Sequence, residues 1–233
     1  MLKPKARLLI DLVIISMFLP LALPLFILFG DYINNNANLL SIILLSIIEF
    51  CGAGLGAFVI IFIRNESFLE YGITKKNLKK SLGLGILFIS IMVLLKSIDA
   101  GEFLYFPMRN HTAMKYSLQQ FFPFNYLGII ITLSIWGIVE GIYFVVIIKK
   151  IEDLFTNKTK LQFFMAPVIF FIYDFLIHYI VRVFVEQRTY NFSVMDVLLS
   201  LILSYAIFIP RKLTGNSWGS MIYQTIQNGL GKM

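Results

Sequence analysis

Residues 39–63 read LLSIILLSIIEFCGAGLGAFVIIFI and decide the class of the fold. Glu49 is the only charged residue in this stretch. A helix that spans a bilayer needs about 20 mostly apolar residues, because the hydrocarbon core is about 30 Å thick and a helix rises about 1.5 Å per residue. The stretch therefore predicts a transmembrane helix.

Similar apolar runs follow one another along the whole chain. Strong runs occupy residues 8–29, 81–98, 126–148, 161–185 and 192–209, and a weaker run occupies 217–230. The intervening segment 103–125 is too polar to span and predicts an interfacial or re-entrant piece, since it carries Arg109, His111, Lys115, Gln119 and Gln120. We expect an all-α fold, a polytopic transmembrane helix bundle of about seven spans plus an interfacial segment, in a single domain over 1–233.

The composition excludes a soluble protein. Of 233 residues, 58% are hydrophobic and 14% are charged, whereas soluble domains average about 25% charged residues. The first apolar run is too long for a signal-peptide core, so we predict a retained helix. Cys51 is the single cysteine and can form no intramolecular disulfide.

The net charge of +7 indicates membrane topology rather than nucleic-acid binding. Its lysines and arginines gather in short clusters between the apolar runs, where topology determinants belong. With a cytoplasmic N-terminus, 14 of the 20 fall on the inner side. We therefore predict a multi-pass cell-membrane protein, N-terminus inside, whose partners are membrane lipids and no nucleic acid. The basic segment 65–80 is partly amphipathic and is predicted to lie on the inner surface.

Small residues between Cys51 and Ala57 superficially resemble a phosphate-binding loop. The stretch CGAGLGA has no preceding strand and no Lys-Ser or Lys-Thr pair, and it lies within an apolar run. Small residues at such positions let transmembrane helices approach closely. We interpret this stretch, and Ser81–Gly85, as helix-packing surfaces.

Polar side chains at membrane depth are costly and each needs a structural or functional reason. Asp11 and Asp196 lie near the ends of their runs, where each can reach the interface or a neighbouring lysine. Glu49 lies deeper and is either a hydrogen bond between helices or a functional group. Asp174 and His178 are four residues apart and share a helical face, so they form either a site or a hydrogen-bonded pair that joins two helices.

A second group of polar residues predicts a cavity inside the membrane. Glu140 lies within Trp136–Phe144, and Gln224 and Asn228 are four residues apart in the last run. Taken together they predict a shared polar cavity, with Tyr143, Asp174 and Glu49 as further candidate residues. Glu140, Gln224 and Asn228 are expected to converge within side-chain reach.

These residues resemble the CPBP family, which includes CAAX proteases and bacteriocin-processing (Abi) proteins. Thr214-Gly215-Asn216-Ser217-Trp218 is similar to the start of the family's last motif helix, Asn228 falls on its final Asn, and Gln224 falls where the family has a catalytic His. Upstream, Glu140 matches the first Glu of the Glu-Glu-x-x-x-Arg motif. Gly141 and Val145 replace its second Glu and its Arg. The resemblance covers roughly 65–231.

The middle motif of the family, Phe-x-x-x-His, can be placed in two ways. Phe170 and Asp174 have the right spacing with Asp in the His position, and His178 lies one turn further on. The resemblance implies an intramembrane site in which Glu140, His178 and Asn228 are the remaining catalytic candidates. Because an amide is not basic, Gln224 cannot replace His as a general base or as a metal ligand. No metal and no cofactor are therefore expected.

Three functions remain open at this point. The first is a CPBP-like bacterial membrane protein with a degraded protease site. It would act in envelope or lipoprotein maturation, such as lipoprotein N-acylation, or in bacteriocin immunity, on a lipid-linked or peptide substrate or with a membrane partner protein. The second is an active intramembrane endopeptidase that uses Glu140 and His178. The third is a small proton-coupled transporter with Glu49, Asp174 and His178 as its proton path, although the chain lacks the internal repeat that many transporters show.

Overall fold

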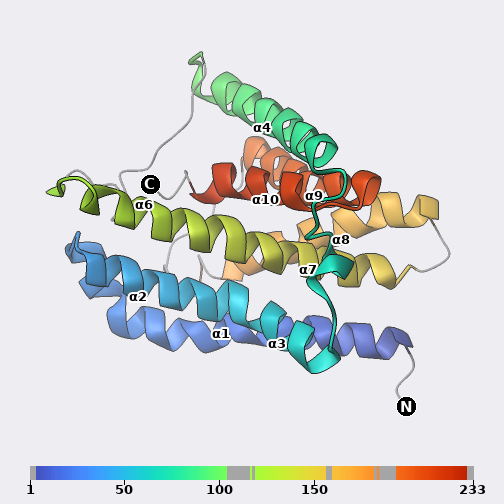
Figure 1. The fold of residues 1–233 in the computed structure, drawn as a ribbon, viewed down its shortest axis with the longest axis horizontal. Helices are drawn as coiled ribbons and strands as arrows, with labels where there is room; N and C mark the ends of the chain where they lie inside the picture. Colours follow the sequence, from blue (N-terminus) through green and yellow to red (C-terminus); the bar gives the residue numbers. More distant parts are fainter. Residues whose placement is uncertain are drawn as a thin grey trace. The chain divides into compact units, whose positions relative to one another are not determined.

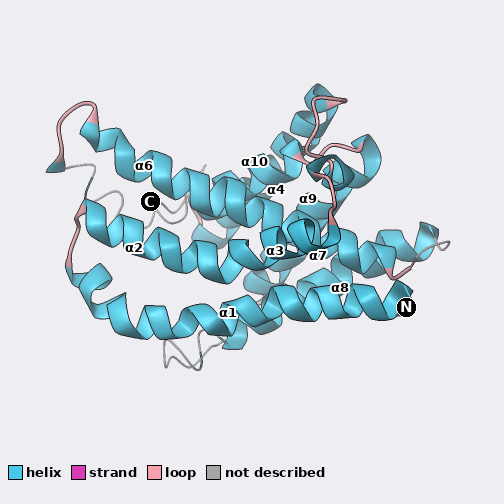
Figure 2. Cartoon of the chain, turned by 60° about the horizontal axis from the view of Figure 1, so that its bottom comes forward, coloured by secondary structure: helices cyan, strands magenta, loops and turns pink. Residues whose placement is uncertain are grey.

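The computed structural model describes residues 4–103, 116, 119–155, 159–180, 183 and 193–229. Over these residues the chain is helical and holds no strand (Figures 1 and 2). Most of the predicted interfacial segment 103–125, including Arg109, His111 and Lys115, lies outside them. The all-α class predicted from the sequence is confirmed.

Among the described residues, six helical stretches are long and apolar enough to cross a membrane. They are Lys5–Asn35, Leu39–Arg64, Leu78–Ala100, Phe124–Asp153, Lys160–Ile177 and Val194–Thr214. Each contains or overlaps one of the strong apolar runs. The seventh, weaker run begins with α10 (Trp218–Gln224), followed by the π-helix η6 (Thr225–Gly229). Whether this last segment crosses a membrane stays a prediction.

The first helix shows how these sequences face lipid. Helix α1 (Pro4–Asn35) is apolar along almost its whole length. Leu9, Val13, Met17 and Leu21 recur every four residues, and each is more than half exposed. An exposed apolar stripe of this kind is stable only against an apolar solvent, so it indicates a lipid-facing surface.

Local sequence signals set several helix ends. Asn38 caps α2 (Leu39–Glu49) by accepting a hydrogen bond from Ser41 N at 2.9 Å. Helix α9 (Val194–Thr214) begins with a capping box of Ser193 and Asp196, and it ends at Gly215, whose φ is 67°. It extends past the predicted end at 209 and includes Pro210, Arg211 and Lys212.

The chain forms two compact units, and each is interleaved in sequence. The first consists of Met1–Leu12, Ser67–Tyr105 and Phe144–Tyr223. In it α4 (Leu78–Ala100) and α8 (Thr159–Ile180) each pack against α9. Edge-to-face contacts of Phe144 with Phe170 and of Phe163 with Phe208 join its helices at centroid distances of 5.4 and 5.7 Å.

The second unit consists of Val13–Glu66, Phe106–Tyr143 and Gln224–Met233. Here α1 and α2 lie side by side, and α6 (Leu127–Thr132) packs along α2 (Figures 1 and 2). Ala22, Ile33 and Ile48 form a buried core between α1 and α2. The prediction of a single domain over 1–233 stays a prediction.

The described residues of the second unit also include three π-helical segments. They are η1 (Phe50–Gly54), which leads into α3 (Leu55–Arg64), η4 (Leu133–Val139), which leads into α7 (Glu140–Asp153), and η6. A π-segment holds more residues per turn than an α-helix and is found often at functional sites. The segments η1 and η6 each pack against η4.

Candidate functional site

The centre of the candidate site is Glu140, at the point where η4 becomes α7. Its residue is 6% exposed. The backbone N–H of Glu140 donates to Gly137 O and Ile135 O, which closes the π-segment. The site therefore begins with a buried carboxylate on a helix whose local winding changes at that residue.

Small residues bring the neighbouring segments against η4. A Cβ atom added to Gly137 would lie 2.3 Å from Thr225 Oγ1, and one added to Gly229 would lie 3.1 Å from Leu133 Cδ2. These two contacts show that η6 runs antiparallel to η4. A Cβ atom on Gly54 of η1 would lie 2.5 Å from Val139 Cγ1.

Two amide side chains reach the carboxylate of Glu140. Gln224 Nε2 donates to Glu140 Oε2 at 2.8 Å, and Asn228 Nδ2 donates to the same oxygen. Gln224 is 1% exposed. The predicted convergence of these three residues, 84 and 88 positions apart in sequence, is confirmed. One oxygen of the carboxylate therefore accepts from both amides.

Three buried side-chain oxygens in α6, α10 and η6 have no hydrogen-bond partner within the described part of the chain. They are Gln224 Oε1, Gln227 Oε1 and Thr132 Oγ1. Buried polar atoms are normally paired, and amide oxygens can only accept. These oxygens could therefore accept hydrogen bonds from donor groups on a ligand.

Sequence reasoning missed Gln227 and Thr132. The signal for Gln227 was present, since it lies three residues after Gln224 and residues three and four apart share a helical face. Thr132 carried no comparable signal, because threonine is common in apolar helices and usually bonds its own backbone.

The chemistry of this set is that of binding. Glu140 offers anionic oxygen, and the two amides are neutral hydrogen-bonding groups that are neither basic nor acidic near neutral pH. Among the described residues, no cluster of three or more His, Cys, Asp or Glu side chains is arranged to hold a metal ion. The expected absence of a metal and of a cofactor stays a prediction.

The remaining candidates occupy different elements. Tyr143 is buried one turn after Glu140 in α7. Glu49 is partly buried at the end of α2, next to η1. Asp174 is buried in α8, which belongs to the first unit. His178 lies in the same helix, and its side chain is outside the described residues. The parts of Asp174 and His178 in the site stay predictions.

The residues interpreted as structural have structural partners. Lys150 Nζ donates to Asp11 Oδ2 at 3.1 Å, and both side chains are at most 4% exposed. Asp196 belongs to the capping box of α9. Asp11 thus reaches a lysine, as the sequence interpretation allows, and Asp196 instead caps the start of its own helix.

The small-residue stretches also pack as predicted, with one exception. Gly85 and Ser81 of α4 face Gly219 of α10, and a Cβ atom on Gly219 would lie 1.9 Å from Ser81 O. Gly52 and Gly56 lie against α1. A Cβ atom on Gly83 would meet nothing within 4 Å, so this glycine takes no part in the contact.

The stretch Thr214–Trp218, which carried the family resemblance, forms a joint with the loop before α4. Asn216 Nδ2 donates to Thr74 O at 2.5 Å and to Lys76 O at 2.8 Å, and Asn77 Nδ2 donates to Thr214 O at 2.7 Å. Ser217 donates from N to Gly72 O and from Oγ to Tyr71 O. We call residues 71–77 and 214–217 the loop joint. It fixes the start of α10, which carries Gln224.

Comparison of the chain with protein-family models, with curated proteins and with solved structures found no match.

Proposed function

We propose that this chain is a CPBP-like protein of the bacterial cell membrane that binds its substrate at Glu140 without hydrolysing peptide bonds. One observation carries the proposal. The side chain at the position of the family's catalytic His is Gln224, and it donates a hydrogen bond to Glu140. In a hydrolytic site this position would take a proton from water or ligate a metal.

The hydrogen bonds explain why hydrolysis is not expected. Gln224 and Asn228 both donate to Oε2 of Glu140, so a water molecule at that oxygen would compete with two amide donors. Neither amide can act as a second base. The orienting Glu and Arg of the family motif are Gly141 and Val145 here. The groups that remain can bind and orient a polar group at membrane depth.

The unpaired acceptors support a binding role. Gln224, whose amide nitrogen binds Glu140, has a buried Oε1 oxygen without a partner among the described residues, and so does Gln227 three residues later in η6. Together with Glu140 they suit a ligand that carries N–H or O–H donors. A lipid-linked or peptide substrate of envelope or lipoprotein maturation carries such donors. Lipoprotein N-acylation and bacteriocin immunity are the two processes that we propose to test first.

The proposal is tested with the purified full-length chain in proteoliposomes that contain a quenched fluorescent membrane peptide. We expect no cleavage, no stoichiometric zinc, and no gain of cleavage in Gln224→His, because the orienting Glu and Arg are still missing. Cleavage by the wild type that stops in both Glu140→Ala and His178→Ala would replace the proposal by the endopeptidase function.

A cellular assay tests the binding role itself. The chain is expressed in a bacterial host, and the N-terminal acylation of its lipoproteins is measured by mass spectrometry, alongside survival on a bacteriocin panel. We expect wild type to change one of these readouts and Glu140→Ala to abolish the change. Unchanged readouts with both proteins would refute both processes.

A further inference from the structure

A cluster of four lysines lies at the start of α4, in the first compact unit. Lys75, Lys76, Lys79 and Lys80 are all exposed. None of them forms an ion pair with a described residue, and the sequence holds no acidic residue between Glu70 and Asp99. The carboxylate of Glu70 is engaged in the capping box of Ser67. The positive charge of the cluster is therefore uncompensated locally.

The backbone under these lysines is held in place by the loop joint. Asn216 binds the carbonyl oxygens of Thr74 and Lys76, and Asn77 binds that of Thr214. Ser81 Oγ donates to Asn216 O at 2.7 Å and accepts from Gly219 N at 2.9 Å. Four long side chains thus extend from a fixed backbone, which lowers the entropy lost when they bind a common anion.

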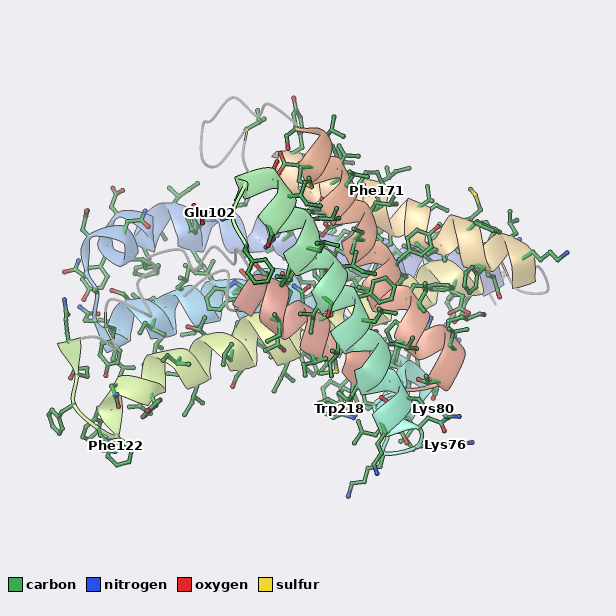
Figure 3. All side chains as sticks on the ribbon, turned by 90° about the horizontal axis from the view of Figure 1, so that it is seen from above. Lys76, Lys80, Glu102, Phe122, Phe171 and Trp218 are labelled. Carbon is green, nitrogen blue, oxygen red and sulfur yellow. The ribbon has the colours of Figure 1, made fainter. Side chains whose placement is uncertain are left out.

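The position of the cluster in the fold indicates that it lies at a membrane surface. Two membrane-crossing candidates meet there, because Val194–Thr214 ends and Leu78–Ala100 begins at the loop joint. Figure 3 shows Trp218 beside the start of α4, with Lys76 and Lys80 pointing away from the helices. Tryptophan is enriched at the headgroup level of membranes, and lysines beside a spanning helix attract anionic lipids.

We propose that Lys75, Lys76, Lys79 and Lys80 form a preformed binding site for the phosphate groups of anionic phospholipids. Charge complementarity selects the ligand, because an anionic headgroup such as phosphatidylglycerol compensates the cluster and a zwitterionic phosphatidylcholine headgroup does not. The site is independent of the function proposed for Glu140. It fixes the depth of the loop joint, and hence of the start of α10, in one leaflet.

The experiment compares two double variants that each remove two exposed charges from the first turn of a helix. Lys79→Gln with Lys80→Gln removes half of the cluster on α4. Lys5→Gln with Arg7→Gln is the matched control on α1, where both side chains are exposed. The full-length protein is placed in detergent, and the binding of phosphatidylglycerol and of phosphatidylcholine is titrated by native mass spectrometry.

We expect phosphatidylglycerol affinity to fall roughly fivefold for each lysine removed from α4, which corresponds to about 1 kcal/mol each. Because the loop joint does not hold the first turn of α1, the control pair should change it by less than about twofold, and phosphatidylcholine binding should not respond to either pair. Equal losses in both pairs, or no loss in the α4 pair, would overturn the proposal.

Two further variants test whether lipid binding needs the fixed backbone of the loop joint or only the positive charge of the lysines. Asn216→Ala removes two hydrogen bonds of the loop joint and leaves the net charge unchanged, and Ser217→Ala removes one. Both are expected to weaken phosphatidylglycerol binding at unchanged charge, with thermal unfolding showing that at least one remains folded. Wild-type affinity in a folded variant would show that the fixed backbone is not needed and would refute the preformed site.

Discussion

At the scale of single residues, the partners of the buried charged side chains distinguish the structural ones from Glu140, the candidate functional residue. Asp11 and Lys150 neutralise each other, and Arg211 and Lys212 both bind Glu152. Glu140 is different, because the two partners that reach its Oε2 oxygen are neutral amides. We propose that this amide-bound carboxylate binds a ligand, whereas Asp11 and Glu152 belong to structural ion pairs.

Glu140→Gln tests this distinction. The substitution keeps the volume and removes the charge, so we expect loss of the cellular readout with nearly unchanged membrane abundance. Immunoblots of membrane fractions measure abundance beside the lipoprotein and bacteriocin assays. Disappearance of the protein would show that Glu140 holds the helices together instead.

For the buried ion pair of Asp11 and Lys150 we expect the opposite result, a loss of stability. Asp11→Asn removes the carboxylate charge that Lys150 binds, and breaking a buried pair costs about 3–5 kcal/mol. Thermal unfolding in detergent should show a large loss of stability. The double variant Asp11→Leu with Lys150→Met should recover most of it, since a buried pair is often replaceable by apolar residues. A double variant as unstable as the single one would refute this account.

At the scale of elements, glycine contacts decide which helices can touch. Helices α4 and α10 approach until Gly85 and Gly219 are in backbone contact, and η4 meets η6 at Gly137 and Thr225. Sequence analysis identified Ser81–Gly85 as a packing surface, because small residues in an apolar helix are typical of close approach. It could not tell Gly83 from Gly85, since only the direction each faces distinguishes them.

The pair Gly219 and Gly83 provides a matched test of the α4 contact. Gly219→Ala places a Cβ atom 1.9 Å from Ser81 O, so we expect a loss of at least about 1–3 kcal/mol of stability. Gly83→Ala meets open space and should be neutral or stabilise the helix by up to about 1 kcal/mol. Thermal unfolding of both variants distinguishes them, and equal effects would contradict the contact.

The contact between η4 and η6 can be tested by rescue. A Cβ atom on Gly137 would lie within 2.8 Å of three side-chain atoms of Thr225, so Gly137→Ala should destabilise the seam that carries Glu140. Adding Thr225→Gly removes those three atoms and should restore stability in part. If the double variant unfolds no later than Gly137→Ala, the clash is not the cause.

At this scale, the π-segments are the feature that the sequence did not predict. The apolar runs 39–63 and 126–148 were predicted as continuous helices, and the structure winds Phe50–Gly54 and Leu133–Val139 more loosely. Hydrophobic periodicity reports length and burial, and one extra residue in a turn leaves both almost unchanged. The convergence at Glu140 was nevertheless predictable, because Gln224 and Asn228 are polar residues on one helical face that an apolar surrounding would not tolerate unpaired.

At the scale of the whole molecule, length and hydropathy were sufficient for the helix map. Six predicted runs correspond to six helices that could cross a membrane. The partners of buried charges were less predictable: sequence placed Asp11 near a neighbouring lysine, and only the fold identified Lys150, 139 positions away. The pairing of Asn216 with the loop before α4 had no signal in the sequence beyond the resemblance.

The predicted orientation is testable with reporters of compartment. Because 14 of the 20 lysines and arginines fall on one side, a reporter fused after Lys160 should report the cytoplasm and one fused after Arg188 the outside. Paired phosphatase and fluorescent-protein fusions measure this. The reverse result at both positions would overturn the orientation and move the lysine cluster to the outer leaflet.

The ion pair between Asp11 and Lys150 also has a consequence for biosynthesis. Asp11 leaves the ribosome near the beginning of translation, and its partner follows 139 residues later. At about 5–20 residues per second, this delay is roughly 7–28 s. For that interval the nascent first helix carries an acidic group that the lipid interior disfavours. We expect the first helix to take its final position only once α7 has been made, so its packing is a late event in assembly although it is synthesised first.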